Sequence, residues 1–119
     1  MRAAVFTICA LLALPALEGR DVLRIRVSPA TVVAPGFFTV RVNIEADAGN
    51  RRLRVVAESP DFFRSSEIQL DGANASPLSV FEFRDLPTGL YEVTGTLVGT
   101  DGPRATVSQL ARVQPSPGH

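Results

Sequence analysis

Runs in which apolar and polar residues alternate constrain the fold of this chain more than any other feature of its sequence. The clearest run follows the turn signal Pro87-Thr88-Gly89 and extends to residue 98. One face of this run carries Tyr91, Val93, Gly95 and Leu97, whereas the other carries Glu92, Thr94 and Thr96. A period of two residues is typical of a half-buried antiparallel strand. We therefore expect a strand here that buries Tyr91.

The same alternation recurs along the chain between proline and glycine turn signals, of which the sequence contains 9 residues each. Further strands are expected over residues 23–27, 37–45, 51–58, 67–70, 78–84 and 104–113, with a short edge segment at 31–33. Pro29 and Pro35 flank that segment, a position that suits an edge strand passing from one sheet to another. Seven main strands without helical periodicity predict an all-β antiparallel sandwich.

The N-terminal segment has the composition of a signal peptide. Met1-Arg2 supplies a positive charge, residues 3–14 are apolar apart from one threonine, and Ala16 or Gly19 offers a small residue for cleavage. The apolar run is shorter than the roughly 20 residues that span a bilayer. We expect a signal-peptide helix over residues 1–16, an exported domain over 17–113 and a flexible tail over 114–119. An uncleaved anchor and a buried helix are the alternatives.

Charge and cysteine content restrict the partners and the compartment. The 12 basic residues, all arginine, balance 12 acidic ones, which gives no reason to expect nucleic acid or an anionic membrane as partner. A membrane contact is expected only transiently, through the signal peptide. The single cysteine, Cys9, lies in that segment, so the exported domain has no disulfide. The expected location is secreted or periplasmic.

The strand spacing and the run Leu86-Pro87-Thr88-Gly89-Leu90-Tyr91-Glu92-Val93 resemble bacterial immunoglobulin-like and fibronectin type III-like domains. In those families a similar turn followed by tyrosine opens the sixth strand of a seven-stranded sandwich. The resemblance covers most of residues 22–113. Carboxypeptidase-regulatory-like and transthyretin-like domains share the same pattern and are the nearest rivals. The chain lacks the tryptophan and the cysteine pair of antibody-type domains.

The resemblance assigns Tyr91 to a tyrosine corner. In this arrangement the ring packs at the edge of the core and the hydroxyl bonds a backbone group a few residues upstream. Gly89 and Pro87 then serve the preceding turn. These three residues are expected to stabilise the scaffold.

No residue set points to catalysis or to a cofactor. Nucleophilic catalysis needs a base beside the nucleophile, and the only histidine is His119 at the chain end. The acidic pairs Asp61 with Glu67, Asp71 with Glu82 and Asp85 with Asp101 have no diagnostic spacing, and the oxygens of residues 45–50 with Asp101 match no calcium motif. We expect no catalytic residue, no metal, no cofactor and no enzymatic activity.

Two features are weak candidates for binding. Arg52 and Arg54, with Arg51 and Arg64, form a small basic group that would suit an acidic partner, or else a solvated strand face. The adjacent Phe62 and Phe63 cannot both point inward from a regular strand, so one either anchors a partner or caps the end of the sandwich. The match of residues 74–76 to the glycosylation pattern is interpreted as a loop.

These observations lead to one functional hypothesis with two alternatives. The hypothesis is a non-enzymatic, exported β-sandwich module that contacts an unknown protein or a cell-surface polymer. A carbohydrate-binding module is the first alternative, although few aromatic residues remain for stacking on sugars. A small secreted hydrolase is the remote alternative.

Overall fold

The computed structural model describes residues 22–117, and regular alternation makes this part of the chain all-β. Two sheets contain eight strands, and one 3-10 turn lies between the fifth and sixth. The elements are β1 (Leu23–Ser28), β2 (Thr31–Val33), β3 (Gly36–Ile44), β4 (Asn50–Ser59), β5 (Phe62–Gln69), η2 (Gly72–Asn74), β6 (Leu78–Leu86), β7 (Gly89–Gly99) and β8 (Gly102–Gln114). The predicted all-β class with two sheets is confirmed.

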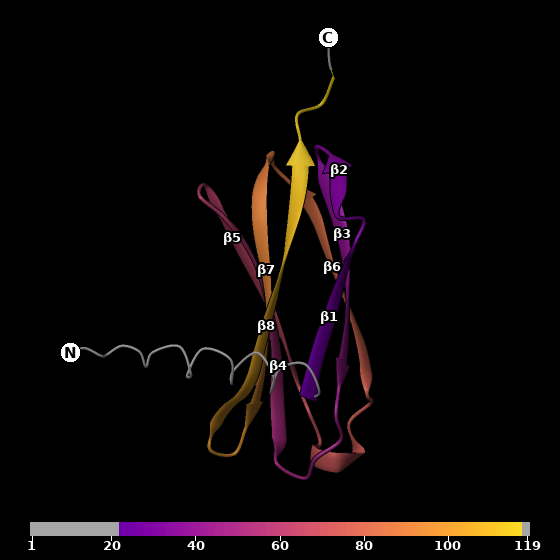
Figure 1. Cartoon of the computed structure of the whole chain (residues 1–119), viewed down its shortest axis with the longest axis vertical. Coiled ribbons are helices and arrows are strands. Elements are labelled where there is room, and N and C mark those ends of the chain that lie inside the picture. The colour runs from indigo at the N-terminus through magenta and orange to yellow at the C-terminus, as the bar shows by residue number, and fades with distance from the viewer. Residues whose placement is uncertain (1–21, 118–119) are drawn as a thin grey trace, which may run out of the picture.

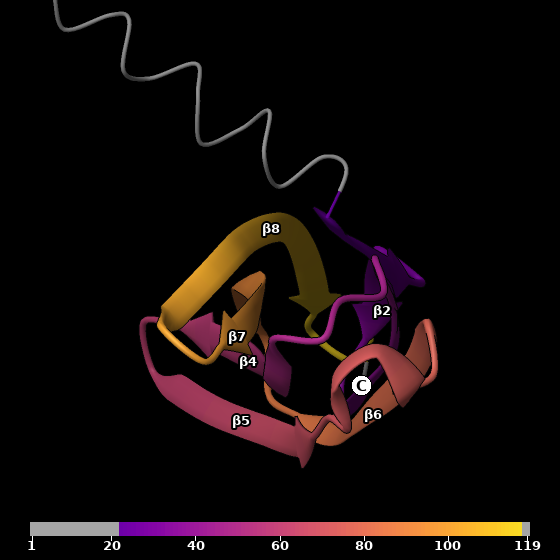
Figure 2. The same cartoon turned by 90° about the horizontal axis from the view of Figure 1, so that it is seen from below.

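The two sheets differ in size and curvature. The smaller has the order β1-β3-β6 and the larger has the order β2-β8-β7-β4-β5. All pairings are antiparallel except that β2 lies parallel to β8, because the chain passes from one sheet to the other between β1 and β2. Figure 1 shows the strands running along the length of the molecule, and Figure 2 shows the larger sheet curling around the core opposite β1 and β6.

The structure has one strand more than the seven main strands predicted, because the expected edge segment at 31–33 forms a strand, β2, that pairs with β8. β5 also differs from the prediction, in its length. Residues 59–65 were expected to form a connection, whereas Ser59 and Phe62 end a tight hairpin and β5 already begins at Phe62. β5 is an edge strand that pairs only with β4, and its central Ser65 and Ser66 are both exposed. A strand that buries neither face at its centre shows no alternation there, so the sequence predicted only its C-terminal part, as a strand over residues 67–70.

The two sheets come close together along one side of the molecule, where β1 of the smaller sheet lies against β7 and β8 of the larger sheet. Gly95 permits this approach, because a Cβ atom there would lie 2.9 Å from Cγ2 of Ile25. The side chain of Gln109 then bridges the gap. Its Oε1 accepts from the Val27 amide at 3.0 Å, and its Nε2 donates to the Val27 carbonyl oxygen at 3.4 Å. The free edge of β1 is therefore occupied at Val27 by a side chain.

Tyr91 is the largest fully buried side chain in the core between the sheets. Its hydroxyl donates to the carbonyl oxygen of Pro87 at 2.6 Å, four residues upstream. Its ring meets Phe38 and Phe62 edge-on, with centroids 6.1 and 6.2 Å away. Burial raises the pKa of the Tyr91 hydroxyl above its ordinary value of 10.0, while a hydrogen bond with Ser59 and the charge of Arg64 act in the opposite direction.

The expected signal peptide over residues 1–16 lies outside the described residues and stays a prediction. Within residues 22–117, no helix has the length and apolar character needed to cross a membrane. At the other end, β8 continues through Gln114, so the expected tail begins one residue later than the sequence suggested.

Candidate functional site

The outer face of the smaller sheet carries a group of arginines that alternation directs away from the core. Arg24 and Arg26 are exposed on β1, with the buried Val27 and Leu23 on the opposite face. Arg41 is exposed on the neighbouring strand β3 between the buried Val40 and Val42. We call Arg24, Arg26 and Arg41 the arginine cluster.

Strand register brings these arginines together. Arg26 lies directly opposite Arg41, and Arg24 lies opposite Asn43. With Ile25, these four residues line a shallow depression of about 330 Å³. Two like charges placed opposite each other on neighbouring strands repel and destabilise a sheet.

No carboxylate within residues 22–117 forms an ion pair with these arginines. The ion pairs of the described residues join Arg52 and Arg54 to Glu67, Arg84 to Glu82, and Arg104 to Asp47. Members of the arginine cluster take part in none of them. The cluster is therefore a concentration of positive charge in a chain whose formal net charge is zero.

The predicted basic group on β4 is arranged differently. Arg52 and Arg54 both pair with Glu67 across the β4–β5 register, with N–O distances of 3.1 and 3.4 Å. Arg51 donates to the carbonyl oxygens of Ala48 and Asn50. The structure thus supplies these arginines with partners inside the chain and does not combine them into one free patch.

Phe62 and Phe63 point in different directions, as expected for neighbours on a strand. Phe62 is half-buried against Tyr91, and the guanidinium of Arg64 lies over its ring, 5.0 Å from the centroid. Phe63 is 61% exposed. Phe62 therefore covers the end of the core, and of these two residues Phe63 is the one that presents its ring to solvent.

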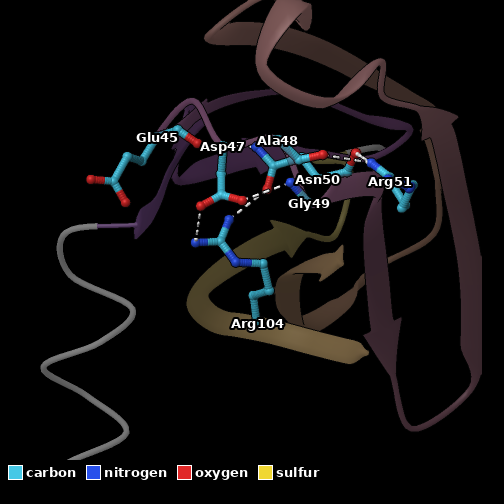
Figure 3. Close-up of polar contacts among 7 residues, drawn as sticks. All are labelled: Glu45, Asp47, Ala48, Gly49, Asn50, Arg51 and Arg104. Atoms are coloured by element: carbon cyan, nitrogen blue, oxygen red, sulfur yellow. Dashed lines mark hydrogen bonds and ion pairs between the residues drawn. The ribbon is translucent and has the colours of Figure 1, made fainter. Parts of the chain in front are cut away.

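The turn between β3 and β4 forms a polar cluster with the start of β8 (Figure 3). Asp47 accepts from the Gly49 amide at 2.7 Å and pairs with Arg104 at 3.4 Å. Arg104 also donates to Asn50, a fully buried side chain whose amide group donates to the Glu45 carbonyl oxygen at 3.0 Å. Each buried polar group has a partner, so this cluster holds the turn in place.

The carboxylates do not combine into a catalytic or metal-binding group. Glu67 and Glu82 pair with arginines, and the strand register places Asp85 and Asp101 at opposite ends of the molecule. Across the described part of the chain, no three histidine, cysteine or acidic residues gather closely enough to hold a metal ion. The oxygens of residues 45–50 serve the turn cluster instead.

Comparisons with known proteins find similarity in structure only. No protein-family model matches the chain, and no curated protein matches its sequence. A solved structure of superoxide reductase (neelaredoxin) from Ignicoccus hospitalis is similar, with a TM-score of 0.58 and 15% identity over 78% of this chain and 80% of that one. Two variants of that protein give TM-scores of 0.59 and 0.53, at 15% and 13% identity. They cover 83% and 81% of this chain, and 86% and 81% of their own.

These neighbours show the fold and correct the family assignment. The resemblance to immunoglobulin-like and fibronectin type III-like domains was wrong, because no family model supports it and the similar solved structures are superoxide reductases. A proline-glycine turn followed by a tyrosine corner suits any sheet that closes over an aromatic core. The motif around Tyr91 therefore predicts the local packing of a tyrosine and does not identify one family of β folds.

The same comparison corrects the functional hypothesis. The prediction of a non-enzymatic interaction module is contradicted, because proteins with this fold are named as enzymes. The expected secreted or periplasmic location stays a prediction. The non-enzymatic prediction rested on the missing base beside a nucleophile and on the undiagnostic spacing of the carboxylates. A fold does not define function in either direction, since sites are built on folds by particular residues.

The donor set of the described residues does not fit a redox metal. Iron, copper and similar metals are held in proteins chiefly by imidazole and thiolate ligands, together with carboxylates. The only histidine and cysteine of the sequence, His119 and Cys9, lie outside residues 22–117.

Sequence reasoning missed the arginine cluster, although part of its signal was present. Arg24 and Arg26 alternate with Leu23, Ile25 and Val27, which identifies an exposed strand face. The sequence did not reveal that Arg41, 15 positions after Arg26, is paired with it. Pairing register between strands is a tertiary property, and net charge conceals a local excess.

Proposed function

We propose that this protein binds an anionic ligand through the arginine cluster. The observation that carries the proposal is the direct opposition of Arg26 and Arg41 beside Arg24, with no carboxylate partner in residues 22–117. Guanidinium groups present planar N–H donors that match phosphate, sulfate and carboxylate oxygens, often two at a time. A bound anion would replace the repulsion within the cluster by attraction.

Asn43 adds a neutral donor to the same site. Its exposed side chain lies opposite Arg24, so an anion between β1 and β3 would meet amide as well as guanidinium groups. The depression is partly open, so a ligand group can reach it from solvent. Because exposed charges are screened by salt, binding should weaken as the ionic strength rises.

Thermal unfolding in the presence of inorganic phosphate tests this function. A ligand that binds only the folded state raises the midpoint of unfolding with concentration. We expect phosphate to stabilise the protein more than chloride at equal ionic strength, and Arg26→Gln/Arg41→Gln to remove the difference. The double variant Arg52→Gln/Arg54→Gln removes the same charge from the other sheet and is the matched control. Equal stabilisation of all three proteins, or of none, would overturn the proposal.

Superoxide reduction is a second candidate, favoured by the names of the structural neighbours. The donor set of residues 22–117 does not support it, so any metal would have to use donors elsewhere, such as His119 or Cys9. The test supplies the purified protein with ferrous iron and measures superoxide consumption and bound iron. Catalytic consumption that is lost in His119→Ala or Cys9→Ser would support this candidate, and consumption equal to that of free iron would reject it.

A further inference from the structure

Two exposed aliphatic side chains lie directly beside the arginine cluster. Leu78 and Val80 are on β6, the other neighbour of β3, and are 45% and 51% exposed. The register places Val80 opposite Arg41 and Leu78 opposite Asn43. Neighbouring strands are about 4.8 Å apart, so the positive and the aliphatic residues share one face about 10 Å wide.

Two neighbouring rows of this face combine basic and aliphatic residues, whereas the next row, Ser28, Thr39 and Glu82, is polar. Its acidic residue Glu82 pairs with Arg84 at 3.0 Å, and Arg84 in turn lies over the exposed ring of Phe37, 4.8 Å from the centroid. Arginines without an ion-pair partner beside exposed aliphatic groups form a surface that suits the anionic and apolar boundary of a membrane. At such a boundary, anionic groups would bind the arginines and an apolar layer would bury the aliphatic side chains.

We propose that the outer face of the β1-β3-β6 sheet docks on the surface of a bilayer that contains anionic lipids. Lipid phosphates would contact the arginine cluster, and Leu78 and Val80 would enter the boundary between headgroups and acyl chains. This inference rests on the proposed anion-binding function and assigns its ligand to a membrane. The positive charge of the arginines favours an anionic surface. The exposed Leu78 and Val80 favour a membrane over a soluble polyanion, because only the membrane also offers an apolar layer.

The expected effect is additive in the basic residues. Each arginine near an anionic membrane surface strengthens binding by about fivefold, so the three-residue cluster contributes roughly a hundredfold. The electrostatic attraction reaches only about one Debye length from the membrane surface, and this length shortens as salt is added. Binding should therefore weaken strongly between 0.01 M and about 0.15 M salt. Leu78 and Val80 should add a contribution that does not depend on salt.

Cosedimentation of the full chain with vesicles tests the inference. Vesicles of phosphatidylcholine alone are compared with vesicles that also contain one quarter phosphatidylglycerol. The apolar N-terminal residues 3–14 are present in every variant, so the ratio of binding to the two vesicles measures the contribution of the sheet. We expect this ratio to fall about 25-fold in Arg26→Gln/Arg41→Gln and to stay unchanged in Arg52→Gln/Arg54→Gln.

Variants of the two aliphatic residues distinguish membrane binding from the binding of other anionic ligands. Leu78→Ser/Val80→Ser should weaken vesicle binding severalfold while leaving the phosphate effect on thermal unfolding intact. The single exchange Val80→Thr keeps shape and strand propensity, and should weaken vesicle binding in the same direction if the double variant does not fold.

Failure of the two proposals can be told apart. If phosphate stabilises the protein but phosphatidylglycerol does not increase vesicle binding, anion binding stands and the membrane inference is wrong. Heparin binding that is unchanged by Leu78→Ser/Val80→Ser, without preference for anionic vesicles, would assign the site to a soluble polyanion and also overturn the inference. If neither phosphate nor vesicles respond to the arginines, both proposals are wrong.

Discussion

Replacing Tyr91 by phenylalanine is expected to remove one hydrogen bond and one alkaline titration from the protein. The hydroxyl donates to the Pro87 carbonyl oxygen at 2.6 Å, while the ring packs edge-on against Phe38 and Phe62. Phenylalanine preserves the ring contacts. Because Pro87 is exposed, water can replace the lost donor, so the free energy of unfolding at pH 7 should fall by only about 1 kcal/mol.

The alkaline behaviour follows from the raised pKa of the Tyr91 hydroxyl. The neutral hydroxyl is favoured in the folded state, so its contribution to stability is complete below pH 10, the ordinary pKa in the unfolded chain. It is lost as the pH rises from there through the folded pKa, at about 1.4 kcal/mol for each pH unit between the two pKa values. Tyr91→Phe should show no such loss.

The composition makes this measurement specific. Tyr91 is the only tyrosine, tryptophan is absent, and all basic side chains are arginine. Ultraviolet absorbance of tyrosinate therefore reports one group, and no lysine titrates in the same range. Urea unfolding at pH 7 and at several values between pH 9.5 and 11.5 gives the free energy of unfolding of the unchanged protein and of Tyr91→Phe. The titration of Cys9 is common to both proteins and cancels in the difference. A tyrosinate midpoint at or below 10, or an equal alkaline loss in Tyr91→Phe, would refute the reasoning.

Other variants probe the contacts between the sheets, the turn cluster and the arginine cluster. Gly95→Ala should cost about 1–3 kcal/mol in urea unfolding, because its Cβ would lie 2.9 Å from Ile25 Cγ2; an unchanged midpoint would contradict this close approach. Asn50→Ala should cost about 2 kcal/mol by leaving the Glu45 carbonyl oxygen without this donor and Arg104 with Asp47 alone, as urea unfolding would show. Arg41→Gln should raise stability by up to about 1 kcal/mol at low salt and by less at 1 M salt; destabilisation at low salt would show that its repulsion from Arg26 is already relieved.

The structural neighbours constrain how fold and function are related in this chain. The superoxide reductases share its fold at 13–15% identity, which says nothing by itself about shared chemistry. In the described residues of this chain, the feature that departs from an ordinary solvated surface is the arginine cluster rather than a set of metal donors. The proposals therefore rest on residues of this chain.

Local patterning was sufficient to identify the all-β class and most of the strands. Alternation around Tyr91 and in β3 directs large side chains to one face, and each such pattern is complete within about ten residues. The same information finds only the C-terminal part of β5, because the exposed Ser65 and Ser66 interrupt the alternation at its centre. It fails for the family, because the turn before Tyr91 occurs in several folds.

The position of the candidate site was decided by contacts between distant parts of the chain. The sequence places Arg26 and Arg41 on exposed strand faces, but only the β1–β3 register sets one directly opposite the other. The β3–β6 register then adds Val80 beside them. A shift of one residue in either pairing would reverse which side chains face solvent, so burial of both apolar faces selects this register. That selection depends on the packed core, which no local segment contains.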